Sequence, residues 1–171
     1  MFTAWDTFSR WVSRAGAITG RIFIFLLMLL ITVDITGRYF GYPTMLAHEM
    51  SAYLLVAICF IGLSYALRTG SHIEVTVVRD RLSPKVRQIL MVVTSCIATI
   101  FCGWLTWVTL NVAIESLIQN TTSITIIHTP LWIPQSFISL GLAMITIELI
   151  TETLRRIIGQ APSESNVAKG V

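Results

Sequence analysis

Four long apolar runs, separated by short polar segments, constrain this chain more than any other feature. A membrane-spanning helix needs about 20 mainly apolar residues, because the hydrocarbon core of a bilayer is about 30 Å thick. The runs that meet this length cover about residues 16–37, 48–67, 88–112 and 131–150. Backbone groups in lipid must be paired within their own segment, so each run is predicted to be an α-helix. We therefore expect an all-α integral membrane protein with four transmembrane helices in a single domain, residues 1–171.

The composition agrees with a membrane location. Hydrophobic residues make up 54% of the chain and charged residues only 12%, about half of the share that is usual in a soluble domain. No basic patch is interleaved with aromatic residues, so a nucleic-acid partner is not expected. Three cysteines lie inside the apolar runs without metal-ligand spacing, which predicts that they are small buried side chains: Cys59, Cys96 and Cys102.

Basic residues are distributed asymmetrically along the chain. Three Lys or Arg residues accompany the N-terminal arm, five lie in the 68–87 segment and three in the tail, whereas the 36–47 loop has one and the 113–129 loop has none. Cytoplasmic segments carry the excess of basic residues in membrane proteins. Both termini and the middle connection are therefore predicted to be cytoplasmic. The first run lacks a signal-peptidase site, so it is expected to be a retained span.

The middle connection, RTGSHIEVTVVRDRLSPKVR, is too polar to span a membrane and too apolar for a free linker. Its apolar residues share one helical face: Ile73, Val77, Val78 and Leu82. This pattern predicts a short amphipathic helix over about 71–82 at the cytoplasmic surface, with an ordinary basic loop as the alternative. Ser83 and Pro84 are then the N-cap and first residue of the third span. The tail over about 158–171 is expected to be flexible.

Charged residues gather at the ends of the predicted spans. Asp34 and Arg38 have the i, i+4 spacing of a favourable helical ion pair, and Glu49 enters the second span at the same level. We expect an Asp34–Arg38–Glu49 cluster at the outer edge, which either fixes two helices together or faces a partner protein. At the cytoplasmic end, Glu152 and Arg156 have the same i, i+4 spacing and are assigned a structural role.

The predicted midplanes of the four spans carry no charged residue or histidine. They lie near Met28, Ile58, Ile100 and Leu140, and only Arg21 and Asp34 on the first span come within about two helical turns. A proton relay or ion site needs an ionisable residue or a broken helix near the bilayer centre. By itself the chain is therefore not expected to be a conduit. No metal site or cofactor is expected in it.

Several motifs occur in a family-specific order. RY ends the first run, EMSAYL opens the second, and FIG, ALRTGSHIEV and LSP follow. This order resembles the small membrane subunit (the Q, or DctQ-type, subunit) of tripartite ATP-independent periplasmic (TRAP) transporters over about residues 15–155. The chain departs from that pattern at Ala47-His48, where many members have a Trp before the acid, and at Thr76, where many have an Asp.

The resemblance implies a non-catalytic scaffold subunit in the bacterial inner membrane. Transporters of this family import organic anions, such as carboxylates or sugar acids, with a sodium gradient. The partners implied are a large elevator-type membrane subunit, which holds the sodium, and a periplasmic solute-binding protein. Two alternatives remain open: a self-sufficient small four-helix exporter that uses Asp34, and a haem-bearing anchor subunit with ligands from His48 and His128.

The same resemblance assigns roles to individual residues. Arg38, Glu49 and Tyr53 are candidates for organising the outer end, together with Asp34. Candidates for positioning the surface helix are Arg68, Gly70 and His72. Four residues that should face the periplasm are candidates for contact with the binding protein: Tyr42, Thr44, Ile124 and His128.

Overall fold

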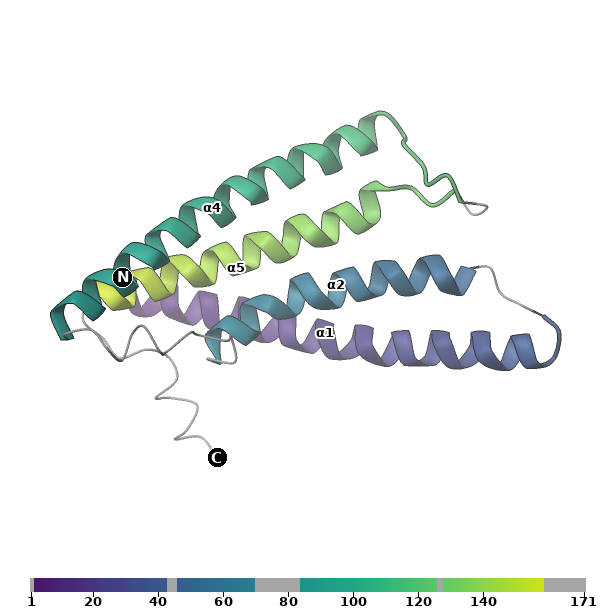
Figure 1. Cartoon of the computed structure of the whole chain (residues 1–171), viewed down its shortest axis with the longest axis horizontal. Helices are drawn as coiled ribbons and strands as arrows, with labels where there is room; N and C mark the ends of the chain where they lie inside the picture. Colours follow the sequence, from purple (N-terminus) through teal and green to yellow (C-terminus); the bar gives the residue numbers. More distant parts are fainter. Residues whose placement is uncertain (1, 43–45, 70–83, 126–127, 159–171) are drawn as a thin grey trace.

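Four long α-helices make up most of the protein. The computed structural model describes residues 2–42, 46–69, 84–125 and 128–158. The helices are α1 (Phe2–Tyr39), α2 (Leu46–Arg68), α4 (Pro84–Ile118) and α5 (Trp132–Ile158) (Figure 1). Each is long and apolar enough to cross a membrane. The prediction of four helices capable of crossing a membrane is therefore confirmed for the residues that the structure describes.

The helices extend beyond the predicted spans, most of all at the start of α1. We expected the first span to begin at about residue 16, but the helix begins at Phe2 and has 38 residues. The prediction stopped where charged residues appear. Those residues belong to an amphipathic continuation of the helix, in which Ser9 and Ser13 are buried. The midpoint of α1 therefore lies near residue 21 rather than near Met28.

α5 is the central helix of the bundle. It packs against α4, α2 and α1, while α1 and α2 pack against each other. Half of the most apolar stretch of α5 is buried inside the protein, compared with 17% for α1, 17% for α2 and 6% for α4. Much of the apolar surface of α1, α2 and α4 is thus left for lipid or another protein. Cys59 belongs to this surface, against our prediction of a buried side chain.

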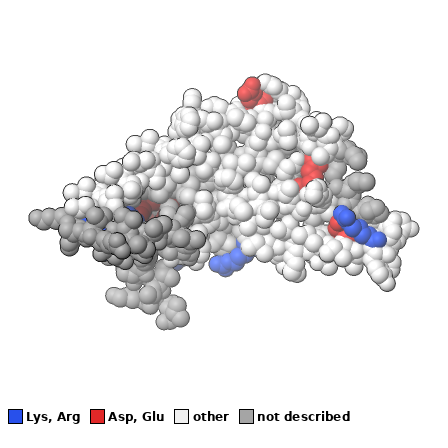
Figure 2. All heavy atoms as spheres, viewed as in Figure 1, with Lys and Arg blue, Asp and Glu red and all other residues white. Residues whose placement is uncertain are grey.

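The two helical hairpins converge at one end and separate toward the other. In Figure 1, α1–α2 and α4–α5 lie closest together near the N-terminus and diverge toward their connecting loops. Most of the surface visible in Figure 2 is uncharged, and charged atoms form only small separate patches. Between two ends that carry polar groups, the bundle therefore presents a mainly apolar surface, on which Arg21 of α1 is an exposed exception.

Close helix crossings depend on two glycines. A Cβ atom on Gly141 would lie 2.5 Å from the backbone carbon of Phe60, so α5 can cross α2 at this distance only without a side chain. A Cβ on Gly16 would lie 2.6 Å from the side chain of Met144 and 3.0 Å from the carbonyl oxygen of Ile61. These contacts bring α1, α2 and α5 together around a small apolar core of Ala57, Ile61 and Met144.

The buried face of α1 has a regular spacing. Buried and half-buried residues follow one another at alternating intervals of four and three: Ser9, Ser13, Gly16, Gly20, Phe23, Leu27, Leu30, Asp34 and Gly37. An interval of 3.5 residues keeps a packing seam facing its neighbour along a long helix. The first three of these residues are small, which allows α2 and α5 to approach α1 in that half.

Both described loops begin with a left-handed residue that ends a helix. Gly41 has a φ of 82°, and the amide of Tyr42 donates to the carbonyl of Gly37 at 2.8 Å. Asn120 has a φ of 50°, and the amide of Thr121 donates to the carbonyl of Ser116 at 3.1 Å. Both arrangements are Schellman motifs, which satisfy the last helical carbonyls.

The loop after α4 then forms a short hairpin. Ser123 and Leu131 donate backbone hydrogen bonds to Thr129 and Thr121 at 2.8 and 3.0 Å. This hairpin fixes residues 121–125 and 128–131 at the far end of the bundle, beside the start of α2.

Some predictions fall outside the described residues. These are the surface helix over 71–82 with Gly70 and His72, the N-cap Ser83, the docking candidate Thr44, and the tail from residue 159 onward. Pro84 is the first residue of α4, as predicted for a proline at the first helical position.

Candidate functional site

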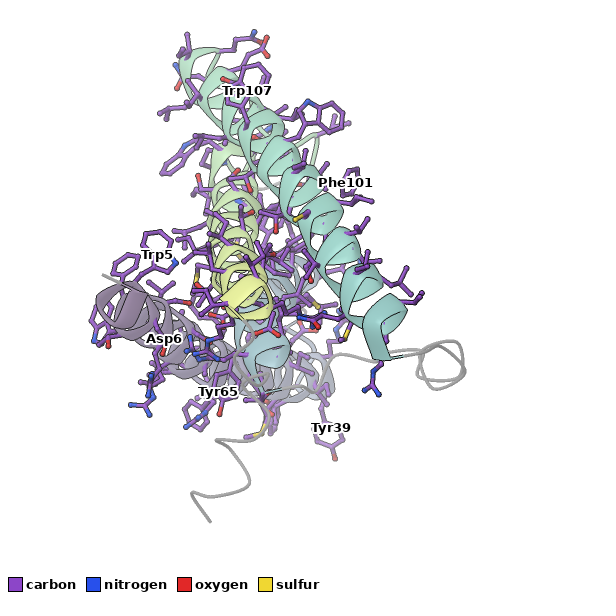
Figure 3. The ribbon with its side chains drawn as sticks, turned by 90° about the vertical axis from the view of Figure 1, so that its left-hand side faces the viewer. Trp5, Asp6, Tyr39, Tyr65, Phe101 and Trp107 are labelled. Carbon is purple, nitrogen blue, oxygen red and sulfur yellow. The ribbon has the colours of Figure 1, made fainter. Side chains whose placement is uncertain are left out.

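Four charged side chains and one serine join three helices at the end of the bundle where the two hairpins converge. It consists of Asp6 and Ser9 on α1, Arg68 at the end of α2, and Glu148 and Arg155 on α5. Figure 3 shows Asp6 and the adjacent Trp5 on the first turns of α1, at this end of the bundle. We call these five residues the inner charge cluster.

The carboxylate of Asp6 accepts hydrogen bonds from three arginine side chains. Its Oδ1 atom accepts hydrogen bonds from Arg68 Nη2 at 2.9 Å and from Arg155 Nη2. Its Oδ2 atom accepts a third bond from Arg10 Nη2 at 2.6 Å, one turn along the same helix. Asp6 therefore ties α1 to both α2 and α5.

Glu148 forms the second half of the cluster. Its Oε2 atom accepts a hydrogen bond from Ser9 Oγ at 2.5 Å and another from Arg68 Nη1 at 3.0 Å. Arg68 thus bridges both acids with its two terminal nitrogens. Next to the cluster, Trp5 Nε1 donates to the hydroxyl of the fully buried Thr151 at 3.1 Å.

The cluster is buried and electrically balanced. The side chains of Asp6, Arg68, Glu148 and Arg155 are 13, 10, 5 and 8% exposed, and their two negative and two positive formal charges cancel. Removing one partner from a buried ion pair leaves an uncompensated charge, which is strongly destabilising. The arrangement therefore fastens three helices together, and both acids are already engaged by arginine.

The predicted ion pair at the end of α5 is present beside this cluster. Arg156 Nε donates to Glu152 Oε1 at 3.0 Å, with the expected i, i+4 spacing. Arg156 Nη1 also lies 3.4 Å from the carbonyl oxygen of Met91 on α4. This contact joins α4 to α5 at the same end of the bundle.

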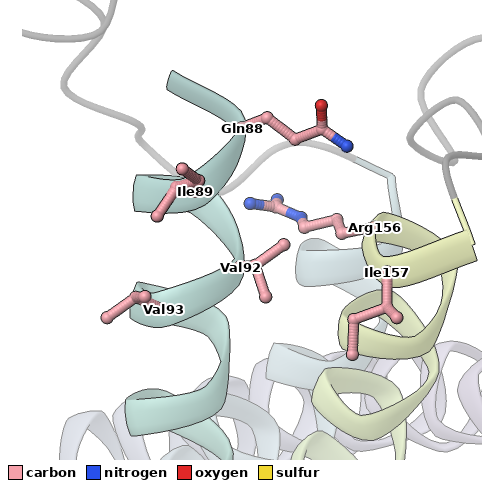
Figure 4. Close-up of a pocket in the computed structure, with 6 residues that line it drawn as sticks. All are labelled: Gln88, Ile89, Val92, Val93, Arg156 and Ile157. Carbon is pink, nitrogen blue, oxygen red and sulfur yellow. The ribbon is translucent and has the colours of Figure 1, made fainter. Parts of the chain in front are cut away.

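An apolar hollow of about 300 Å³ lies between the start of α4 and the end of α5. Figure 4 shows the residues that line it: Gln88, Ile89, Val92, Val93, Arg156 and Ile157. The single charged group in its lining, Arg156, is held by Glu152. Its walls are therefore suited to an apolar chain rather than to a charged solute.

At the opposite end, Glu49 links α2 to the loop before α5. The side chain is buried. Its Oε1 atom accepts a hydrogen bond from Tyr53 Oη at 2.6 Å, and its Oε2 atom accepts one from Thr125 Oγ1 at 2.5 Å. Glu49 and Tyr53 therefore lie together at this end of the bundle.

The expected Asp34–Arg38–Glu49 cluster is divided in the structure. Arg38 Nε donates to Asp34 Oδ2 at 2.8 Å, which confirms the i, i+4 pair. Among the described residues Arg38 forms no ion pair with Glu49, whose carboxylate is directed to Tyr53 and Thr125. The prediction of a three-residue cluster was wrong because it compared only the level of each residue along the bundle and did not include the α4–α5 loop.

The described docking candidates are exposed at this same end. Tyr42 is 79% exposed and Ile124 is fully exposed, and His128 is exposed with a φ of 50°. His48 is also exposed. Within the described ranges, no three or more His, Cys, Asp or Glu side chains come together in a way that would hold a metal ion.

Most of the inner charge cluster was not predicted from the sequence. Asp6 and Ser9 lie before the predicted first span, and Arg68 was a candidate only for positioning the surface helix. One signal was available: Asp6, Ser9, Ser13 and Gly16 recur at intervals of three and four, which is the spacing of one polar helical face.

Comparison with known proteins gives two findings. A family model described as tripartite ATP-independent periplasmic transporters, DctQ component, matches residues 27–159. The chain is also 24% identical over 136 residues to the ectoine TRAP transporter small permease protein TeaB of Halomonas elongata. That alignment covers 77% of this chain and 70% of the relative.

Proposed function

This chain belongs to the DctQ component family of TRAP transporters, and from that membership we propose that it is a non-catalytic scaffold subunit. In this role it braces the large membrane subunit, which carries the solute and the coupling sodium ions. The transporter imports an organic anion, such as a carboxylate or sugar acid, across the bacterial inner membrane. Since one relative is named for ectoine, that solute is included among those to be tested.

The observation that supports this proposal is that the buried charged groups lie at the two ends of the bundle, with an apolar core between them. The apolar core around Ala57, Ile61 and Met144 lies between the inner charge cluster and Glu49. A solute or ion path would need polar or ionisable groups along this core. In the part of the chain that the structure describes, the buried acids are instead engaged by arginine or by hydroxyl groups at the two ends, which suits a rigid support.

The orientation proposed for the subunit follows from its basic residues. The basic residues of the 68–87 segment and of the tail favour a cytoplasmic location for both. The inner charge cluster lies at that end and is then cytoplasmic, and the Glu49 end is periplasmic. The exposed Tyr42, Ile124 and His128 are then available to the solute-binding protein. Their exposure supports a docking role for this end.

Reconstitution into liposomes tests the scaffold role. Uptake of radiolabelled solute driven by a sodium gradient is measured with all three components, with this chain left out, and with this chain alone. We expect uptake only from the complete set. Sodium-driven uptake by this chain alone, abolished in Asp34→Asn, would establish the self-sufficient exporter instead.

A further inference from the structure

The position of Arg21 across the bilayer follows from how α1 lies along α2. α2 has 23 residues and is roughly 35 Å long, which matches one crossing of a bilayer. Ser9 of α1 lies beside Arg68, the last residue of α2, at 3.2 Å. Arg38 is in the last turn of α1, and this end of α1 lies at the same end of the bundle as the start of α2 (Figure 1). Arg21 is twelve residues from Ser9, or about 18 Å along the helix, and seventeen from Arg38. It therefore lies within the hydrocarbon layer and away from both ends of α1.

Arg21 is exposed on the far side of α1 from its buried face. It shares that side with Arg14, Ile18, Phe25 and Met28, which follow at the same alternating intervals of four and three and are all exposed. Neither Arg14 nor Arg21 forms a hydrogen bond or ion pair with any residue that the structure describes. We call these five residues the outer face of α1.

The exposed side of α4 has a different character. Its exposed residues are mostly apolar along the same length, among them Ile89, Val93, Ile97, Ile100, Trp104 and Trp107. The exposed hydroxyl of Thr94 donates to the carbonyl of Leu90 on its own helix. No charged residue lies between Arg87 and Glu115. A helix surface of this composition is compatible with lipid along its whole length.

An arginine that faces lipid away from the ends of a helix is unfavourable, whereas one that faces a protein is satisfied by an acidic side chain or by free backbone carbonyl groups. Near a helix end the side chain can extend to the headgroups, but Arg21 is not near an end. The exposed side of α1 is therefore suited to contact with a protein, and the exposed side of α4 is suited to contact with lipid.

We propose that the outer face of α1, centred on Arg21, is the surface that binds the large membrane subunit, and that α4 faces lipid. This proposal rests on the proposed function, which supplies that partner. The partner must offer a carboxylate or the exposed carbonyls of an interrupted helix at the depth of Arg21. Charge complementarity favours such a partner over a second copy of this chain, whose matching surface would bring Arg14 and Arg21 against like charges.

Photocrosslinking in the complete transporter tests the proposal. A photoreactive amino acid replaces Ile18 or Met28 on α1 and, as matched controls, Ile97 or Ile100 on α4. We expect adducts with the large subunit from the α1 positions at a yield at least fivefold above that of the α4 positions. Equal yields, adducts mainly from α4, or adducts between two copies of this chain would overturn the assignment.

A substitution supplies the second test. Arg21→Leu makes the helix more apolar, so insertion into the membrane is retained, and Arg21→Lys keeps the charge. We expect Arg21→Leu to reduce copurification of the large subunit at least threefold, while Arg21→Lys keeps more than half. Unchanged copurification with Arg21→Leu contradicts the inference alone. Failure of the wild-type chain to copurify with the large subunit contradicts the proposed function itself.

Discussion

Arg68 Nη1 lies 3.0 Å from Glu148 Oε2, and this pair joins the last residue of α2 to the central helix α5. The two residues are 80 positions apart in the sequence. The same guanidinium binds Asp6 on α1 through its other nitrogen. One side chain therefore connects the three helices that converge at this end.

Replacement of Arg68 by Gln should strongly destabilise the bundle, because Asp6 and Glu148 then lose a shared buried cation. Removing one member of a buried ion pair typically costs about 3–5 kcal/mol. Thermal unfolding in detergent measures the loss. Arg10→Gln is the matched control: its side chain is 50% exposed, so its loss should cost under about 1 kcal/mol. Equal effects of the two variants would show that the burial of Arg68 does not matter.

The variant Ser9→Ala should be destabilising by about 1–3 kcal/mol, because the buried Glu148 carboxylate loses a hydrogen-bond donor. Chemical unfolding in mixed micelles measures this change. Ser51→Ala is a suitable control, since that hydroxyl only donates to the carbonyl of His48 on its own helix. A stability equal to wild type in Ser9→Ala would mean that Arg68 alone satisfies Glu148.

Glu49→Gln should weaken assembly with the large subunit or reduce uptake, without changing solute preference. The amide cannot accept from both Tyr53 and Thr125 as the carboxylate does, so the α4–α5 loop becomes less firmly attached to α2. Competition between labelled and unlabelled solutes measures preference, and copurification measures assembly. Tyr53→Phe should act in the same direction but more weakly. A shifted preference with intact assembly would place Glu49 in a solute site.

Gly141→Ala should reduce stability by about 1–3 kcal/mol, since overpacking forces neighbouring groups apart. The new Cβ would lie 2.5 Å from the backbone of Phe60, which cannot move without shifting α2. Gly62→Ala is the matched control, because nothing lies within 4 Å of its Cβ position. That control should be neutral or slightly stabilising, as alanine favours the helix. Thermal unfolding of both variants in the same detergent measures the two changes in stability. Equal stability of the two variants would contradict the prediction.

Local sequence patterns predicted the parts of the fold that depend on neighbouring residues. The apolar runs gave the number of helices, and the i, i+4 spacing gave the pairs Asp34–Arg38 and Glu152–Arg156. Pro84 marked the start of α4. These features follow from helix geometry and from the thickness of a bilayer, which act over a few residues or over one span.

Contacts between distant segments were not predictable in the same way. The bond between Glu49 and Thr125 joins residues 76 positions apart, and nothing in their local sequence indicates that the loop bends back to α2. The close crossing at Gly141 has the same origin, since an isolated glycine in an apolar helix does not reveal which neighbour it contacts. The early start of α1 was missed because charge was taken to mark a boundary, although Asp6 is neutralised by Arg68 and Arg155 inside the bundle.

The inner charge cluster also sets an order of events during synthesis. Asp6 and Arg155, which form a hydrogen bond, are 149 positions apart, so the acid leaves the ribosome long before this partner exists. Arg68 reaches it first, and Glu148 and Arg155 arrive together only with the last helix. Until α5 inserts, Arg68 therefore lacks its second acid, Glu148, and Asp6 lacks Arg155. A chain that ends before residue 148 therefore lacks the ion pairs that fasten α1 and α2 to the central helix.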